Sequence, residues 1–193
     1  MAKQTYTTTT TGGAWTTLVS GECTVASLIV NATTETTLLS LRVTLANGTF
    51  SYILPVNTLP YNSPNRLAIG GISLKAGDKL EALSVSPADW VTTVVTGISY
   101  TSGVVTSVAG DVWTTLVTGP RTVRGIFVSC AAVGTVGIRI KKASTEASIV
   151  LSEELKSGGS KRLMIPLVLG AGETLQVRGS TPASWIATGI ETT

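Results

Sequence analysis

The sequence repeats itself, and this internal repeat is the strongest constraint on the fold. The segment LKAGDKLEALSVSPADW, residues 74–90, resembles LGAGETLQVRGSTPASW, residues 169–185, at a constant offset of 95. An earlier pair, residues 14–30 and 112–128, matches at an offset of 98. The offset changes by only a few residues along the chain, as expected when insertions and deletions fall in loops. The repeat predicts two homologous domains within the 193 residues.

The limits of the repeat define the expected domain boundaries. We place the first domain at residues 14–98 and the second at residues 112–193. A Thr/Gly-rich N-terminal arm, residues 1–13, precedes the first domain, and a linker, residues 99–111, joins the two. The arm has almost no apolar residues to bury, so we expect it to be extended, and disordered when free.

Each copy has the pattern of β-strands. Apolar residues recur on both sides of Asn47-Gly48 in residues 39–54, which predicts a β-hairpin with positive φ at both turn positions. Apolar residues also alternate over residues 136–140, which predicts one buried and one exposed face. Thr and Val dominate the sequence, and their β-branched side chains favour extended backbone. Helix signals are nearly absent, and we expect a loop at residues 152–161.

The segment at residues 74–90 also contains a turn that recurs in the second copy. Gly77 is free to adopt positive φ, and Asp78 can bond to the nearby backbone. Pro87 closes the segment, because proline is excluded from central strands. Strands separated by about 8–12 residues, several in each copy, are typical of a sandwich. The sequence predicts an all-β protein with two tandem homologous antiparallel β-sandwich domains, jelly-roll-like, and an extended N-terminal arm.

The composition argues against catalysis. The chain has no histidine, which excludes His-based acid–base catalysis, the Ser-His-Asp triad and the commonest metal ligand. No metal-ligand spacing, phosphate loop or dinucleotide fingerprint occurs in the sequence. We expect no enzyme activity, no cofactor and no metal site. Cys23 and Cys130 occupy non-equivalent places in the two copies, and we expect both to be free thiols.

The balance of apolar and charged residues favours assembly with partners. Hydrophobic residues make up 43% of the chain and charged residues 13%, and the mean hydropathy is +0.37. No apolar run approaches the ~18 residues that a membrane span needs, so we expect no membrane association. The net charge of +3 is too small to predict nucleic-acid binding. The N-terminus lacks the apolar segment of a signal peptide, which favours assembly in a cytoplasm.

Two sets of residues are candidates for binding. The polar, β-prone arm is expected to add a strand to the sheet edge of a neighbouring subunit. The recurrent tryptophans are expected either to anchor the repeated fold or to bind partners, since large aromatic side chains dominate burial. The interface candidates are Tyr6, Thr7, Thr8, Thr9, Trp15 and Trp113. In an alternative interpretation, Trp90 and Trp185 are stacking platforms for a glycan.

Four short motifs resemble a known group of proteins. They are a Trp-Thr-Thr-Leu-Val-x-Gly opening, a strand of the Leu-Ile-Val-Asn kind, a Leu-x-Ala-Gly-Asp-x-Leu turn and a closing Thr-Gly-Ile. Together they resemble small β-sandwich virion proteins of tailed bacteriophages, which occur as capsid decoration or cement proteins and as neck or tail accessory proteins. The resemblance covers nearly the whole chain.

This resemblance implies a function without chemistry. We expect a structural component of a virion that binds capsid, neck or tail subunits, assembles in the host bacterial cytoplasm and forms a homo-oligomer, a trimer or a hexamer. Two domains on one chain would bridge neighbouring subunits, or fill two quasi-equivalent positions in an oligomer, and would raise the effective concentration of the second contact. The alternatives are a carbohydrate- or receptor-binding module of a phage tail or fibre, and a secreted adhesin subunit.

Overall fold

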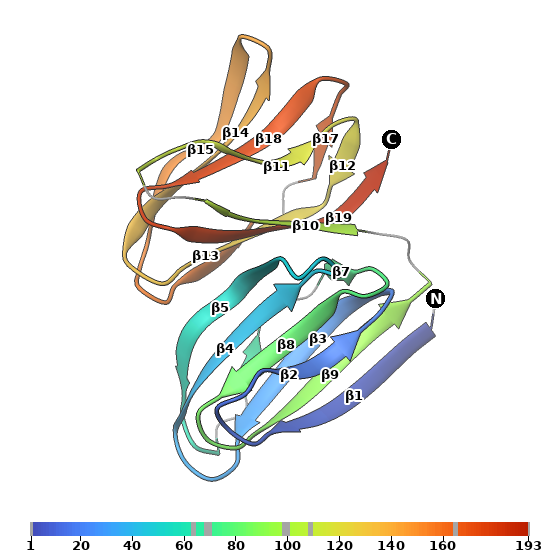
Figure 1. Ribbon diagram of the computed structural model, residues 1–193, viewed down its shortest axis with the longest axis vertical. Helices are drawn as coiled ribbons and strands as arrows, with labels where there is room; N and C mark the ends of the chain where they lie inside the picture. Colours follow the sequence, from blue (N-terminus) through green and yellow to red (C-terminus); the bar gives the residue numbers. More distant parts are fainter. Residues whose placement is uncertain are drawn as a thin grey trace. The chain divides into compact units, whose positions relative to one another are not determined.

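The computed structural model describes residues 2–62, 65–67, 71–97, 101–107, 110–163 and 166–192. These residues form strands, turns and bends, and they include no helix that is long and apolar enough to cross a membrane. The chain divides into two compact units, Met1–Tyr100 and Thr101–Thr193 (Figure 1). All strand pairs within the sheets are antiparallel, so the prediction of an all-β, antiparallel fold is confirmed.

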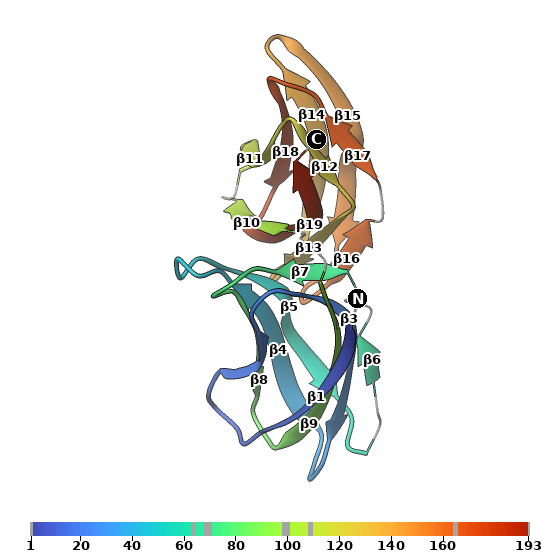
Figure 2. The ribbon, with the colours of Figure 1, turned by 90° about the vertical axis from the view of Figure 1, so that its right-hand side faces the viewer.

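The first unit consists of two sheets packed face to face (Figure 2). One sheet has the order β1-β9-β3-β6, with β7 also paired to β3, and the other has the order β2-β8-β4-β5. Because β6 and β7 lie one after the other along β3, the unit has the eight-stranded, two-sheet architecture of a jelly roll. Its strands are β1 (Ala2–Thr10), β2 (Thr16–Ser20), β3 (Cys23–Ala32), β4 (Thr37–Thr44), β5 (Phe50–Leu59), β6 (Asn65–Leu67), β7 (Ile72–Leu74), β8 (Lys79–Ser84) and β9 (Ala88–Thr96).

The second unit has the same strand order. β19 pairs with β10 on one side and with β12 and β13 on the other, while β17 and β16 pair with β12 and β13. The second sheet has the order β11-β18-β14-β15. The strands are β10 (Thr101–Ser107), β11 (Thr114–Thr118), β12 (Arg121–Val123), β13 (Gly125–Cys130), β14 (Gly134–Lys142), β15 (Thr145–Leu155), β16 (Ser160–Leu163), β17 (Leu167–Leu169), β18 (Glu173–Gly179) and β19 (Ala183–Thr192).

The two units agree in register as well as in order. Val30 pairs with Trp90 in the first unit, and Val128 pairs with Trp185 in the second. The interruption between β12 and β13 falls where β3 has a register shift. Positions that match in the sequence therefore occupy the same places in the two sheets.

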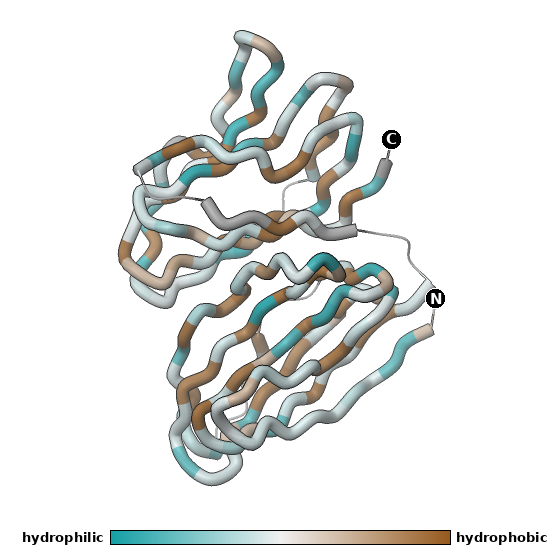
Figure 3. The backbone as a smooth tube through the Cα atoms, viewed as in Figure 1, coloured by the Kyte–Doolittle hydropathy of each residue, from teal (hydrophilic) through white to brown (hydrophobic). Residues whose placement is uncertain are grey.

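The core of each unit lies between its two sheets. Alternate residues of the strands point inward, and Figure 3 shows the resulting alternation of brown and pale segments along them. The largest fully buried side chains are Trp90, Trp185, Leu28, Leu41, Leu59, Ile72, Leu74, Leu80, Ile126, Ile138, Leu169 and Leu175. Full burial of one such side chain contributes about 1.5–3 kcal/mol relative to exposure.

The N-terminal arm, expected at residues 1–13 outside the first domain, is instead part of the first unit. Residues 2–10 form β1, which pairs with β9 from Ala2 opposite Thr96 to Thr10 opposite Ala88. The arm therefore covers a sheet edge of its own chain. Thr10, at the end of β1, is buried and fixes this end of the strand.

The expected linker, residues 99–111, also contributes a strand. Residues 101–107 form β10, which pairs with β19 and completes the first sheet of the second unit. Residues 99, 100, 108 and 109 lie outside the described residues. The boundary between the units falls between residues 100 and 101 of the chain, so β10 belongs to the second unit and is not a spacer.

The predicted hairpin is present, but its turn and its faces differ from the prediction. Only Gly48 has positive φ (85°), and the N–H of Leu45 bonds to the carbonyl of Thr49, which gives a three-residue turn with a bulge. A register shift then places Tyr52 opposite Arg42 and Leu54 opposite Leu41. Because a bulge inserts one extra residue, Tyr52 points outward whereas Leu54 is buried.

The segment expected to be a loop, residues 152–161, is only partly a loop. β15 continues to Leu155, and β16 begins at Ser160. The turn between them is closed by a hydrogen bond from the N–H of Gly159 to the carbonyl of Lys156. Glu153 and Glu154 lie on β15, an edge strand of its sheet, whereas Lys156 lies between the two strands.

Candidate interaction surface

The glycan-stacking interpretation of Trp90 and Trp185 is contradicted by their burial. Both side chains are 0% exposed and lie in the cores of their units. The indole Nε1 of Trp90 donates a hydrogen bond to Thr10 Oγ1 over 3.1 Å, and the same hydroxyl bonds to Ser84 Oγ. A ring that is fully enclosed cannot stack on a sugar, so these residues are anchors of the fold.

Trp15 lies on the outer face of the second sheet of the first unit, where an arginine covers its ring. The Cζ atom of Arg42 lies 4.1 Å from the centroid of the Trp15 ring and 4.8 Å from that of Phe50. Arg42 Nε donates to Glu81 Oε2 at 2.9 Å, which fixes the guanidinium between the rings. Cation–π contacts of this kind contribute about 0.5–2 kcal/mol each.

Trp113 occupies the equivalent place in the second unit. The Cζ atoms of Arg139 and Arg178 lie 4.2 and 4.8 Å from the centroid of its ring. Arg139 Nε donates to Gln176 Oε1 at 2.9 Å, and its guanidinium also pairs with Glu146. Trp15 and Trp113 are thus half-buried and bind arginine side chains of their own chain, and their contact with other proteins stays a proposal.

Asp78 has a structural role in the turn after β7. Its carboxylate accepts hydrogen bonds from the N–H groups of Ala46 and Lys75, both at 3.0 Å. Glu173 repeats the second of these bonds, accepting from the N–H of Gly170 at 2.8 Å. Asp78 is buried, and both of its oxygens are engaged in joining two turns.

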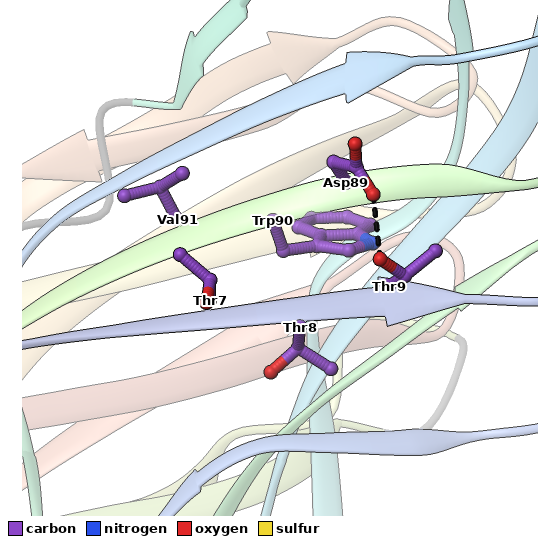
Figure 4. A pocket seen from close by; sticks show the side chains of 6 residues that line it. All are labelled: Thr7, Thr8, Thr9, Asp89, Trp90 and Val91. Atoms are coloured by element: carbon purple, nitrogen blue, oxygen red, sulfur yellow. Dashed lines mark hydrogen bonds between the residues drawn. The ribbon is translucent and has the colours of Figure 1, made fainter.

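The arm residues Thr7, Thr8 and Thr9 border a shallow hollow of about 300 Å³ between β1 and β9. Figure 4 shows Thr9 beside Asp89, to which its hydroxyl donates at 2.6 Å. Thr7, Thr9 and Asp89 lie on the outer face of the sheet, whereas Thr8 and Trp90 alternate to the inner face. The hollow offers hydroxyl groups and one carboxylate to a ligand.

An exposed apolar patch lies on the outer face of the second sheet of the first unit. It consists of Leu38, Val56 and Val85, which are 46%, 54% and 61% exposed. The N–H of Val85 bonds to the carbonyl of Leu38, so these two residues lie opposite each other on neighbouring chain segments. Tyr61, also exposed, lies at the adjacent loop, where its N–H bonds to Thr36 Oγ1. Backbone hydrogen bonds hold the patch in place.

Burial shifts the pKa values of both cysteines and of one arginine. Both cysteines are buried and free, and burial raises the pKa of the Cys23 and Cys130 thiols above the ordinary value. Burial lowers the pKa of Arg162, whose guanidinium lies over the Phe127 ring. No group of three or more His, Cys, Asp or Glu side chains able to hold a metal occurs in the described residues.

The sequence contained a signal for the Trp–Arg stacks but none for the apolar patch. Trp15 and Arg42 recur as Trp113 and Arg139 at nearly the same separation. A tryptophan and an arginine that recur together in both copies indicate a contact between their side chains on one face of a sheet. Leu38 and Val56 lie on β4 and β5, and Val85 follows β8, so the patch combines three separate chain segments and no periodicity in the sequence marks it as a shared surface.

Together, these features define a protein of two jelly-roll units with exposed apolar and polar surfaces. Neither the family models nor the curated proteins include a match to the chain. Among solved structures, the major capsid protein P2 from bacteriophage PM2 matches 99% of this chain and 98% of its own, with 10% identity and a TM-score of 0.46.

Two further solved structures are similar over most of the chain. The PBSX exported protein XepA matches 96% of this chain and 86% of its own, with 9% identity and a TM-score of 0.34. The N-terminal CBM22-1-CBM22-2 tandem domain of Xyn10C from Paenibacillus barcinonensis matches 99% and 91%, with 12% identity and a TM-score of 0.28. Likeness at this level carries no functional assignment.

Proposed function

We propose that this protein is a non-enzymatic structural component of a tailed bacteriophage virion, which binds capsid, neck or tail subunits and stabilises the particle. A decoration or cement role is favoured. The proposal draws on the sequence motifs shared with such proteins and on two jelly-roll units with buried cores. Assembly takes place in the host bacterial cytoplasm.

The observation that carries this proposal is the apolar patch of Leu38, Val56 and Val85. Solvent-exposed apolar side chains that gather on one face mark interaction sites. The patch is formed by residues of β4, β5 and the segment after β8, so it is held by the sheet and needs little ordering on binding. We propose that a virion subunit covers it.

We also propose that the two units arose by duplication, with a boundary between residues 100 and 101. Their common strand order and matched registers support this origin. Each unit offers a separate contact, and linkage of two contacts raises avidity through effective concentration. Trp15 and Trp113 remain proposed contacts in this scheme, within a homo-oligomer of trimeric or hexameric order.

Particle incorporation tests the proposal. Particles assembled with a Leu38→Ser/Val85→Ser variant as the sole copy should retain at least tenfold less of the protein than wild-type particles. The reason is that burial of apolar surface in a contact contributes about 25 cal/mol per Å², and the variant has less apolar surface to bury. Val168→Ser, at a 70% exposed site on β17, is the matched control and should incorporate normally. Quantitative mass spectrometry of gradient-purified particles measures the incorporation of both variants.

Equal incorporation of the two variants argues against a role for the patch. Absence of the wild-type protein from particles refutes the proposal.

One observation favours a second candidate, a carbohydrate- or receptor-binding module. The hollow beside Thr7, Thr9 and Asp89 presents hydroxyl and carboxylate groups, which are suited to bonding sugar hydroxyls. Glycan arrays with the wild-type protein and with Asp89→Ala separate the two candidates. Binding that the substitution abolishes supports this module, and no signal on any glycan leaves the structural role.

A further inference from the structure

We propose that the free edge of β1 joins two copies of this chain, as an antiparallel β1–β1 pair about a two-fold axis centred on Tyr6. The resulting dimer would continue the first sheet of one copy into that of the other. This inference concerns the isolated chain and does not depend on the virion proposal.

The free edge of β1 is long and regular. β1 pairs with β9 over nine residues without a register shift, and no described strand pairs with its other side. Figure 1 shows β1 at the margin of its sheet beside β9. Residues 2–7 are all exposed. A strand in this position presents unpaired N–H and C=O groups, which are a template for another strand.

The other sheet edges among the described residues carry features that hinder such pairing. β5 contains Pro55 and register shifts, and β2, β10, β11 and β15 each have at least one register shift. β6, β7, β16 and β17 are three or four residues long. Proline, bulges and short length are three of the features that protect a sheet edge, and charged side chains such as Lys3 are a fourth. β1 has none of the first three.

The occupant of this edge is a second copy because the charges on its outer face complement themselves. In β1 and β9, odd-numbered residues share the outer face, and its charged members are Lys3 and Asp89. Lys3 lies near the start of β1, whereas Asp89 lies opposite Thr9, near its end. A two-fold axis at Tyr6 places Lys3 beside Thr9 of the second copy. Each lysine then approaches the Asp89 carboxylate of the other copy.

The remaining side chains suit the same arrangement. The centre of the strand Ala2–Thr10 is Tyr6, so this axis gives full overlap of the two strands. Thr5 then faces Thr7 of the other copy, and the two Tyr6 side chains, 41% exposed, meet at the axis. Threonine and aromatic cross-strand pairs are favourable in antiparallel sheets. A hexamer with two-fold axes contains such a contact, whereas a simple trimeric ring does not.

A charge-swap experiment on the full chain tests the dimer. Sedimentation equilibrium at low salt should show a wild-type dimer, and Lys3→Glu and Asp89→Lys should each weaken association at least tenfold, since each places like charges together. The double variant Lys3→Glu/Asp89→Lys should restore it. Lys75→Glu, the same charge change at an exposed turn, is the control and should associate as the wild type does. Circular dichroism confirms that each variant is folded.

Crosslinking locates the axis. Under mild oxidation, Tyr6→Cys should form a disulfide between two chains, because the axis brings residue 6 of each copy together. Lys3→Cys should not, because its neighbour across the pair is Thr9. The native thiols, Cys23 and Cys130, are buried and do not interfere. A monomeric wild-type chain at high-micromolar concentration, association that survives both single charge reversals, or equal crosslinking of the two variants would overturn the proposal.

Discussion

At the residue scale, the four repeated tryptophans have two different roles. Trp90 and Trp185 are enclosed in the cores, whereas Trp15 and Trp113 lie on outer faces under arginine side chains. Each pair, Trp90 with Trp185 and Trp15 with Trp113, occurs at matching positions of the two sequence copies, so recurrence does not distinguish their roles. The difference comes from the strand face on which each ring lies, and a guanidinium held by Glu81 or Gln176 makes the outer position favourable. An aromatic residue that recurs in two copies is therefore not in itself evidence for a ligand platform.

The paired turns after β7 and β17 allow a matched test of backbone strain. Gly77 and Gly172 both have positive φ, +86° and +77°. A Cβ added at Gly77 would lie 2.8 Å from Ala46 Cβ, whereas a Cβ added at Gly172 would have no neighbouring atom within 4 Å. Gly172→Ala should cost about 1–2 kcal/mol from the left-handed conformation alone. Gly77→Ala should cost more, because it adds the clash. Urea unfolding of each variant measures both, and equal losses contradict the role of the contact.

At the element scale, β1 shows how tertiary contacts order a polar segment. Its residues are mostly threonine, and Figure 3 shows it in pale and teal colours along most of its length. The segment is ordered because β9 offers a free edge in register and because Thr10 accepts the Trp90 indole N–H inside the unit. Propensity favours extended backbone, but the partner decides whether the strand forms.

Thr10→Val should therefore destabilise the first unit although it preserves side-chain shape. It leaves the buried Nε1 of Trp90 without its acceptor, at a cost of about 1–3 kcal/mol. Thr9→Val removes an exposed hydroxyl on the next residue and should cost less than about 1 kcal/mol. Denaturant unfolding followed by tryptophan fluorescence compares them. If Thr10→Val unfolds at the same midpoint as Thr9→Val, β1 is not anchored through this bond.

At the scale of the whole molecule, each unit closes its own core. The buried side chains of the second unit, including Val123, Ile138, Leu175 and Trp185, form one cluster between its two sheets. Both units have complete jelly-roll topology, since β1 and β10 supply the edge strands that the expected domain limits left out. Each unit therefore contains all the strands of its own two sheets and needs none from the other unit.

Separate expression of residues 1–100 and 101–193 tests the domain boundaries. Each fragment should show a β-sheet circular dichroism spectrum and one cooperative unfolding transition, with a free energy of about 5–15 kcal/mol typical of small domains. The comparison pair, residues 14–98 and 112–193, lacks β1 and β10 and should be markedly less stable. Fragments 1–100 and 101–193 that fail to fold would contradict independent units.

The fold class, the repeat and the residues of the repeated turns follow from the sequence alone. These depend on short-range patterns, namely alternation along strands and the backbone preferences of Gly77 and Asp78, which are visible without partners. The three-dimensional arrangement of the strands was needed to show that the arm pairs with β9, that Tyr52 points outward and that Leu38 and Val85 share a surface. Each of these depends on which strands meet and in what register, and a single extra residue in a bulge changes the face of every residue beyond it.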